Sequence, residues 1–199
     1  MDLKLIYGNM RALCEAPQMM LHYADIPYEY KMVWDHYGSS WAEVKKDIIF
    51  NRLPILIINE DKYIWQSNTI IRYLSNLTKT KPSDEFQLAY CDAVFESTHE
   101  MFSPLNPTIN MTFGEKYNSN KKKLLEDILP NSLNNFEKLL QNSSGNFFIG
   151  NDPFYCDFNA YHHFSMCLIL DKNIFSNFPN LKKFINNFEK LNNIKNYLD

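Results

Sequence analysis

The sequence predicts an α/β domain followed by an all-helical domain. Short apolar strand patterns alternate with helical periodicity as far as about residue 78, and only helical periodicity is found after it. Between the two, residues 79–84 are rich in Lys, Thr, Pro and Ser, and Pro82 would stop a helix that crossed them. We therefore expect a first domain over residues 1–78, a linker over residues 79–84 and a helical domain over residues 85–199.

The first domain is expected to follow the order β-α-β-α-β-β-α. Leu3–Tyr7 is an apolar run typical of a buried strand, and Pro17 is tolerated in the first turn of the helix after it. Ile55–Ile58 is continuous and mostly β-branched, which also indicates a buried strand, and Ser67 is a natural N-cap for the last helix. The expected strands cover residues 3–7, 28–34, 55–58 and 63–65, and the expected helices cover residues 14–24, 41–47 and 67–77.

The second domain shows helical spacing throughout. Its expected helices cover residues 86–102, 121–140, 157–170, 181–191 and 194–198. The first should end before Pro104 and Pro107, because proline disrupts a helix interior, and the second should be kinked at Pro130. The third is apolar almost all round, which predicts a central buried helix.

Composition excludes several functional classes. The 199 residues carry 20 Lys and Arg against 23 Asp and Glu, a formal net charge of -3, which does not suit a nucleic-acid binder. No apolar run approaches the roughly 18 residues of a membrane helix, and the N-terminus lacks the pattern of a signal peptide. We therefore expect a cytoplasmic globular protein with no nucleic-acid or membrane partner.

The cysteines argue against a metal site. They are scattered, and none forms a Cys-x-x-Cys pair. His163 and Cys167 would share one helix face, but a zinc site needs three or four ligands. We expect no metal.

Two features of the first domain carry chemistry. Pro54 directly precedes a buried strand; if the Leu53–Pro54 bond is cis, Leu53 presents its backbone N–H and C=O to a peptide-like ligand. The alternative is a trans proline that only starts the strand. Ser67 begins a helix whose free N–H groups attract an anion, with the Gln66 side chain as a further donor. The alternative is an ordinary helix cap without a ligand.

Taken together, these features resemble the cytosolic glutathione transferases, in particular the sigma class and its mu, pi and alpha relatives. The resemblance spans nearly the whole chain and implies a thioredoxin-like first domain and glutathione as the co-substrate. It rests on the Tyr-x-Asn-x-Arg turn from Tyr7 to Arg11, the Trp41 and Lys45 pair, residues 50–56 and 66–74, and residues 148–158 and 178–181 in the second domain.

The resemblance also implies a set of site residues. Tyr7 would be catalytic, because a donor held against sulfur favours the thiolate, the form of glutathione that attacks. Glu100 would reach the glutathione of a partner subunit, and Phe50 would plug into the partner of a homodimer. The implied glutathione-binding residues are Tyr7, Trp41, Lys45, Asn51, Arg52, Leu53, Pro54, Gln66, Ser67 and Glu100, and the implied second-substrate pocket comprises Gly8, Arg11, Tyr37, Met101, Pro104 and Leu105.

The chain departs from the family pattern at two positions. Leu13 stands where many sigma members have an arginine that contacts glutathione, and Phe154 stands where the family has a Ser or Thr cap. Asp152 could replace that cap if its helix begins earlier.

Three functions follow from the resemblance. The leading one is conjugation of glutathione to small apolar electrophiles. The others are isomerisation of the prostaglandin D synthase type, and a non-catalytic ligand-binding or structural role like that of the lens S-crystallins. Retention of Tyr7, Trp41, Gln66 and Ser67 favours activity, and Cys14 lies too far beyond the strand to replace Tyr7 in a redox role.

Overall fold

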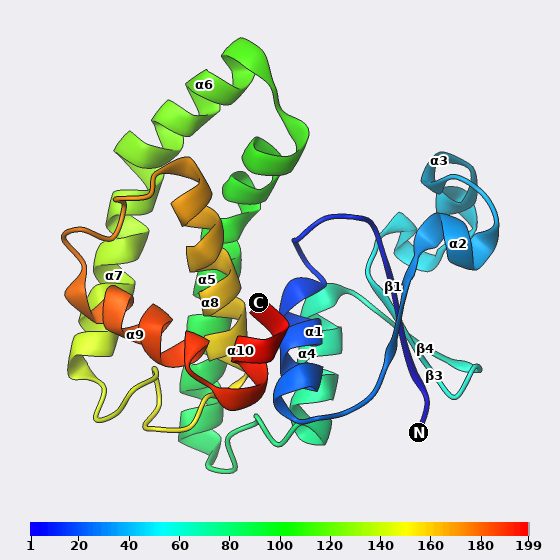
Figure 1. Ribbon diagram of the computed structural model, residues 1–199, viewed down its shortest axis with the longest axis horizontal. Coiled ribbons are helices and arrows are strands. Elements are labelled where there is room, and N and C mark those ends of the chain that lie inside the picture. The colour runs from blue at the N-terminus through cyan, green and yellow to red at the C-terminus, as the bar shows by residue number, and fades with distance from the viewer. Residues whose placement is uncertain (199) are drawn as a thin grey trace. The chain divides into compact units, whose positions relative to one another are not determined.

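The computed structural model describes residues 1–198, and the chain divides into two compact units, Met1–Lys81 and a second unit that begins at Pro82. The first unit holds a four-stranded sheet with helices, and the second holds helices (Figure 1). The predicted fold class, an α/β domain with a thioredoxin-like order followed by an all-helical domain, is confirmed.

The sheet has the strand order β2-β1-β3-β4. Strand β1 (Leu3–Tyr7) pairs in parallel with β2 (Glu29–Met32) and antiparallel with β3 (Ile55–Ile58), which pairs antiparallel with β4 (Lys62–Trp65). All four residues of β3 are buried, as its continuous apolar run predicted. The two central strands therefore form the most buried part of this unit.

Helices cover both faces of the sheet (Figure 1). Helices α1 (Glu15–Tyr23) and α4 (Ser67–Leu77) lie side by side on one face, and α2 (Val33–Tyr37) and α3 (Trp41–Val44) lie on the other. Two short 3-10 turns, Lys45–Asp47 and Ile49–Asn51, connect α3 to β3. On the α2 side, the core consists of Ile6, Val33, Ile48, Ile55 and Ile57.

The predicted strand over residues 28–34 is wrong in its last two residues. Strand β2 ends at Met32, and Val33 begins the short helix α2. Val33 is buried in the core beside β1, so tertiary packing decides its conformation. Gly38, which ends α2 in the left-handed conformation at φ 68°, was the one local signal for this helix.

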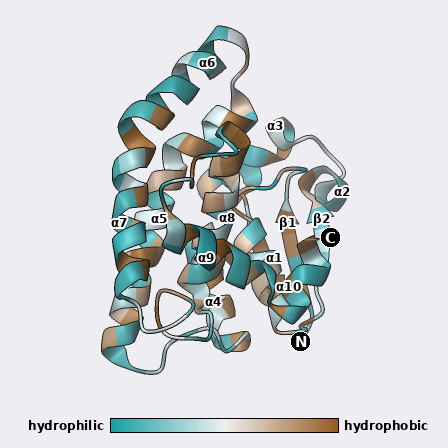
Figure 2. Cartoon of the chain, turned by 60° about the vertical axis from the view of Figure 1, so that its left-hand side comes forward, coloured by the Kyte–Doolittle hydropathy of each residue, from teal (hydrophilic) through white to brown (hydrophobic). Residues whose placement is uncertain are grey.

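The second unit is built around one buried helix. Its helices are α5 (Glu85–Met111), α6 (Gly114–Lys123), α7 (Leu129–Asn142), α8 (Tyr155–Leu170), α9 (Pro179–Glu189) and α10 (Asn192–Leu198). Most residues of helix α8 are buried, although Ile169 is exposed, and the helix packs along α5, as the apolar sequence predicted. Helix α6, in contrast, has no buried residue and is largely teal in Figure 2.

The first helix of the second unit does not end before Pro104. Helix α5 continues through Pro104 and Pro107 to Met111, although neither proline has an N–H to donate. The Thr108 hydroxyl donates to the Pro104 carbonyl (2.9 Å), and the Thr112 hydroxyl donates to the Thr108 carbonyl (2.7 Å). These side-chain bonds, together with packing along α8, offset the lost backbone bonds.

The helix predicted over residues 121–140 is three segments. A π-helical turn, Leu124–Ile128, separates α6 from α7, and Pro130 lies in the first turn of α7. A proline there needs no partner for its missing N–H, so it starts a helix instead of kinking one.

The N-terminus of α8 is held by a buried carboxylate. Asp157 accepts the backbone N–H groups of Phe148 (3.1 Å) and Phe154 (2.8 Å). Phe154 occupies the N-cap position without a side-chain cap bond, and Asp152 is exposed and does not replace it. Burial raises the pKa of Asp157 to about 7, although the two N–H groups act to lower it.

Candidate functional site

Strand register brings three of the predicted site residues to one end of the sheet. Ile55, the first residue of β3, pairs with Ile6 of β1 and with Trp65 of β4. The residues one step farther along each strand are Tyr7, Pro54 and Gln66, so they lie next to one another. This end of the sheet is where α4 begins, at Ser67.

Tyr7 ends β1 with a buried ring, and its hydroxyl oxygen accepts the backbone N–H of Leu13 at 3.3 Å. Burial raises the pKa of Tyr7 to about 12, although the Leu13 N–H acts to lower it. The hydroxyl therefore keeps its proton at neutral pH and can donate a hydrogen bond. The sequence predicted Tyr7 as a site residue, but nothing in the sequence indicated the hydrogen bond from Leu13.

The loop after β1 is fixed by neighbouring side chains. The Tyr30 hydroxyl donates to the Gly8 carbonyl at 2.8 Å. The Arg11 guanidinium binds the buried carboxylate of Glu15 at 2.8 Å, one helical turn away. The orientation of the loop is thus set by bonds at Gly8 and at Arg11. The roles of Tyr30 and Glu15 were missed from the sequence, because neither belongs to a recognisable motif.

The Leu53–Pro54 peptide bond is cis, the alternative that the sequence left open. Leu53 packs against the core cluster of Ile6 and Ile55, and Trp41 of α3 packs against the same cluster. Leu53 and Trp41 are therefore brought together on one side of the sheet. Lys45 follows Trp41 by one helical turn, and its N–H donates to the Trp41 carbonyl, as the predicted spacing requires.

Two cationic side chains are exposed beside this cluster. Lys45 lies in the 3-10 turn after α3, and Arg52 precedes Leu53. Within residues 1–198 neither of them forms an ion pair with an acidic side chain. Asn51, which precedes Arg52, is also exposed and adopts φ 52°.

Gln66, not Ser67, is the N-cap of α4, which corrects the sequence prediction. Ser67 is the first helical residue, is nearly buried, and contacts the Asn68 side chain at 3.4 Å. Gln66 adopts φ 71° and ψ 120°, a backbone conformation that residues other than glycine rarely adopt. Such conformations cost of order 1–3 kcal/mol and persist mainly at functional sites.

Relief of this strain is measurable. We expect Gln66→Gly to raise the free energy of unfolding by about 1 kcal/mol, because glycine adopts positive φ without a steric cost. Urea unfolding would test it. The matched control is Thr69→Gly, at an exposed position inside α4, which should lower stability by about 0.4 kcal/mol. A Gln66→Gly protein that is less stable than the wild type would contradict the strain.

An exposed and largely aromatic patch surrounds the 3-10 turn Ile49–Asn51. Phe50 has 61% of its surface exposed and φ 63°, and its ring meets the edge of Trp65 at 6.2 Å between centroids. Tyr63 stacks on Trp65, also at 6.2 Å between centroids, and Ile49, next to Phe50 in the sequence, is exposed. We call Ile49, Phe50, Tyr63 and Trp65 the Phe50 patch.

The other predicted residues are divided between the two units. Gly8, Arg11 and Tyr37 belong to the first unit, whereas Glu100, Met101, Pro104 and Leu105 lie on α5 of the second. Met101 and Leu105 are buried and Glu100 is exposed. The second-substrate pocket and the role of Glu100 remain predictions.

The cysteines are free thiols and are buried. Burial raises the pKa of the thiols of Cys14, Cys156 and Cys167. A protonated thiol is a poor nucleophile, so Cys14 does not suit a redox role.

In the described part of the chain no three His, Cys, Asp or Glu side chains are arranged to hold a metal ion. Residues 1–198 also contain no helix that is long and apolar enough to cross a membrane.

Comparison with known proteins identifies the family. The family model of the glutathione S-transferase N-terminal domain matches residues 1–76, and that of the C-terminal domain matches residues 99–199. Human glutathione S-transferase Mu 3 is 30% identical over 199 residues, which cover 96% of this chain and 85% of the relative.

Solved structures agree in fold. The Pi-class glutathione S-transferase of Onchocerca volvulus has 26% identity and a TM-score of 0.86, over 100% of this chain and 92% of that one. Rat hPGDS complexed with a quinoline has 24% identity and a TM-score of 0.87, over 100% and 96%, and shares the fold. The sigma class is not among these names and stays a prediction. With both of its domains matched in order, the chain belongs to the glutathione S-transferase family, a family of transferase enzymes.

Proposed function

We propose that the protein conjugates the thiolate of glutathione to apolar electrophiles, with the Tyr7 hydroxyl as the donor that stabilises the sulfur anion. The observation that carries the proposal is the Tyr7 hydroxyl, which is protonated and anchored by Leu13 at the end of β1 where α4 begins. An anchored donor needs no reorganisation when charge develops on the ligand.

The chemistry requires only this donor and a bound thiol. A free thiol with a pKa of about 8.5 is mostly protonated at neutral pH. A hydrogen bond to the sulfur favours the anion and lowers the thiol pKa, and the released proton passes to solvent. The thiolate then forms a carbon–sulfur bond with the electrophile, and the leaving group departs with its electron pair. Tyr7 stays neutral throughout.

The rest of the site would hold the two ends of the tripeptide. The γ-glutamyl end would bind at the N-terminus of α4, where Ser67 and Gln66 add donors to the free backbone N–H groups. The cysteinyl backbone would pair with Leu53 beside Pro54. The glycyl carboxylate would bind the cluster around Lys45 and Arg52, with Trp41 and Asn51 beside it, through charge-assisted hydrogen bonds. The acidic protein thus offers a local cationic site to an anionic ligand.

The proposal is tested by titrating the thiol of bound glutathione through the ultraviolet absorbance of its thiolate. We expect its pKa to fall by one or more units below the value of about 8.5 for a free thiol. Turnover of a generic aromatic halide then measures conjugation. Binding without a lowered thiol pKa and without turnover would favour a non-catalytic carrier or structural protein.

Isomerisation of the prostaglandin D synthase type would use the same thiolate. The likeness to rat hPGDS concerns the fold, and no residue distinguishes the two reactions. Turnover of an endoperoxide without conjugation of the halide would favour the isomerase. We rank conjugation first because the family models and the human relative are named for glutathione transfer.

We propose that the chain forms a homodimer through the Phe50 patch and is located in the cytoplasm, where thiols are kept reduced. Phe50 supports the dimer because an aromatic side chain that is 61% exposed suits a hydrophobic anchor. Glu100 would contact the partner subunit's glutathione, and the second-substrate pocket would hold the electrophile.

Loss of the anchor should separate the subunits. We expect Phe50→Lys to weaken dimerisation by at least about 30-fold, because an interface anchor contributes about 2 kcal/mol or more. Sedimentation velocity over a range of concentrations measures this. The matched control is Phe113→Lys in the second unit, whose side chain is 82% exposed. If Phe50→Lys and Phe113→Lys sediment alike, the patch is not the interface.

A further inference from the structure

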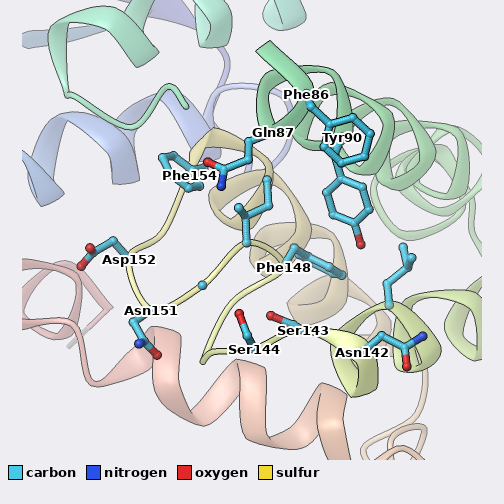
Figure 3. A pocket seen from close by; sticks show the side chains of 13 residues that line it. Phe86, Gln87, Tyr90, Asn142, Ser143, Ser144, Phe148, Asn151, Asp152 and Phe154 are labelled. Carbon is cyan, nitrogen blue, oxygen red and sulfur yellow. The ribbon is translucent and has the colours of Figure 1, made fainter. Parts of the chain in front are cut away.

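A cavity in the second unit shares no residue with the proposed glutathione site. Its volume is about 610 Å³, within the range of roughly 300–1,000 Å³ found for small-molecule pockets. Its walls are the first two turns of α5, the C-terminal end of α7 and the connection from α7 to α8 (Figure 3). All three walls belong to the second unit.

The connecting segment, residues 143–154, is a fixed wall of this cavity. The Ser143 hydroxyl donates to the Phe147 carbonyl and accepts the Gly145 N–H, and the Phe147 N–H donates to the Gly150 carbonyl at 3.0 Å. A Cβ atom at Gly145 would collide with the Gly150 backbone, so the two glycines allow a close turn. The cavity is therefore formed before any ligand binds.

Asp157 fixes the same wall from behind. Its carboxylate accepts the N–H groups of Phe148 and Phe154, whose side chains line the cavity. The turn of residues 143–150 and the start of α8 are thus tied to one buried group. A preformed cavity binds with a smaller entropic cost than one that must be ordered by its ligand.

Apart from Asp152, the lining residues are uncharged, and several of them are aromatic. Phe86 and Tyr90 project from one face of α5, and Phe148 points toward Tyr90 (Figure 3). Phe86 is 79% exposed, so a ligand placed against it would bury a large apolar surface. The polar lining groups are amides and hydroxyls, among them Gln87 and Asn142.

The charges near the cavity disfavour an anion. No Lys or Arg is among its described lining residues. Asp152 is the one charged residue in that lining, and its carboxylate points away from the cavity in Figure 3. Glutathione, its conjugates and fatty acids are anions and would find no counter-charge.

We propose that this cavity is a second binding site that takes an uncharged planar aromatic molecule carrying hydrogen-bonding groups. The ring stacks on Phe86 and Tyr90, and the amides of Gln87 and Asn142 bind its polar groups. Affinity arises from the buried aromatic surface and selectivity from the absence of a counter-ion.

The test uses a pair of probes that differ in charge, 2-naphthol and 2-naphthalenesulfonate, with amide NMR spectra to locate binding. We expect 2-naphthol to shift the amide signals of Ser144 and Gly150, and the sulfonate to bind there at least tenfold more weakly. Phe86→Ala should weaken 2-naphthol binding at these amides by about fivefold. Phe113→Ala, at an equally exposed phenylalanine outside the cavity, should leave it unchanged.

A second variant tests the charge argument without removing the wall. Asn142→Lys should strengthen sulfonate binding several-fold, whereas Gln141→Lys, at an adjacent exposed residue outside the lining, should not. The proposal is overturned if 2-naphthol shifts no amide in residues 143–150, if Phe86→Ala binds it as the wild type does, or if the sulfonate binds as tightly as 2-naphthol.

Discussion

Tyr7→Phe is expected to lower kcat/KM for an aromatic halide by about 100-fold near neutral pH, because removal of one preorganised donor to a developing anion typically costs that much. The affinity for glutathione should change little, since the proposed site holds the tripeptide at its two ends. The thiol pKa of bound glutathione should rise, so the remaining activity should increase with pH. Steady-state kinetics over a pH series, together with thiolate absorbance, measures all three.

Tyr28→Phe is the control for this variant. It removes a tyrosine hydroxyl in the same unit, which donates to Gln18 at 3.1 Å and belongs to no proposed site. Activity equal to that of the wild type is expected. Full activity in Tyr7→Phe would contradict the mechanism, whereas equal losses in both variants would indicate a general effect on the fold.

Asp157→Ala is expected to lower the free energy of unfolding by about 3 kcal/mol, because one buried and one half-buried N–H group lose their acceptor and the central helix loses its cap. Chemical unfolding measures the loss. Asp152→Ala is the matched control, an exposed carboxylate in the same segment that makes no cap bond, and should change stability by less than about 0.5 kcal/mol.

The effect of Asp157→Ala should depend on pH. The folded pKa of Asp157, about 7, lies above its ordinary value of 3.8, so the folded state binds the proton more tightly than the unfolded state. The contribution of this carboxyl is therefore fully present below about pH 4 and declines as pH rises toward about 7. The loss in Asp157→Ala should accordingly be larger at about pH 5 than at about pH 8. A loss that grows with pH would contradict the raised pKa.

The elements that could be predicted from sequence are those with an uninterrupted local pattern. Strand β1, strand β3 and helix α4 have the bounds that their apolar runs and periodicity predict. The failures occur where tertiary contacts override local preference. Val33 starts a helix because it packs in the core, and α5 passes two prolines because threonine side chains and α8 support it.

The candidate site divides in a similar way. Tyr7, Pro54 and Ser67 could be found from sequence because each follows or precedes a recognisable element. The Leu13 N–H could not, because a backbone donor leaves no pattern in the residue types. The pairing of Arg11 with the buried Glu15 carboxylate was missed, although the two residues have the i,i+4 spacing of a helical ion pair. The backbone conformation of Gln66 was also not predicted, because a glutamine at this position gives no sign that its φ is positive.

The buried cysteines allow the opening of each unit to be measured separately. Cys14 is the one cysteine of the first unit, and Cys91, Cys156 and Cys167 belong to the second. A thiol reagent reaches such groups only when the surrounding structure opens, so the labelling rate measures the population of the open state. Labelling followed by mass spectrometry would therefore distinguish separate opening of the two units from a single cooperative transition, without any introduced probe.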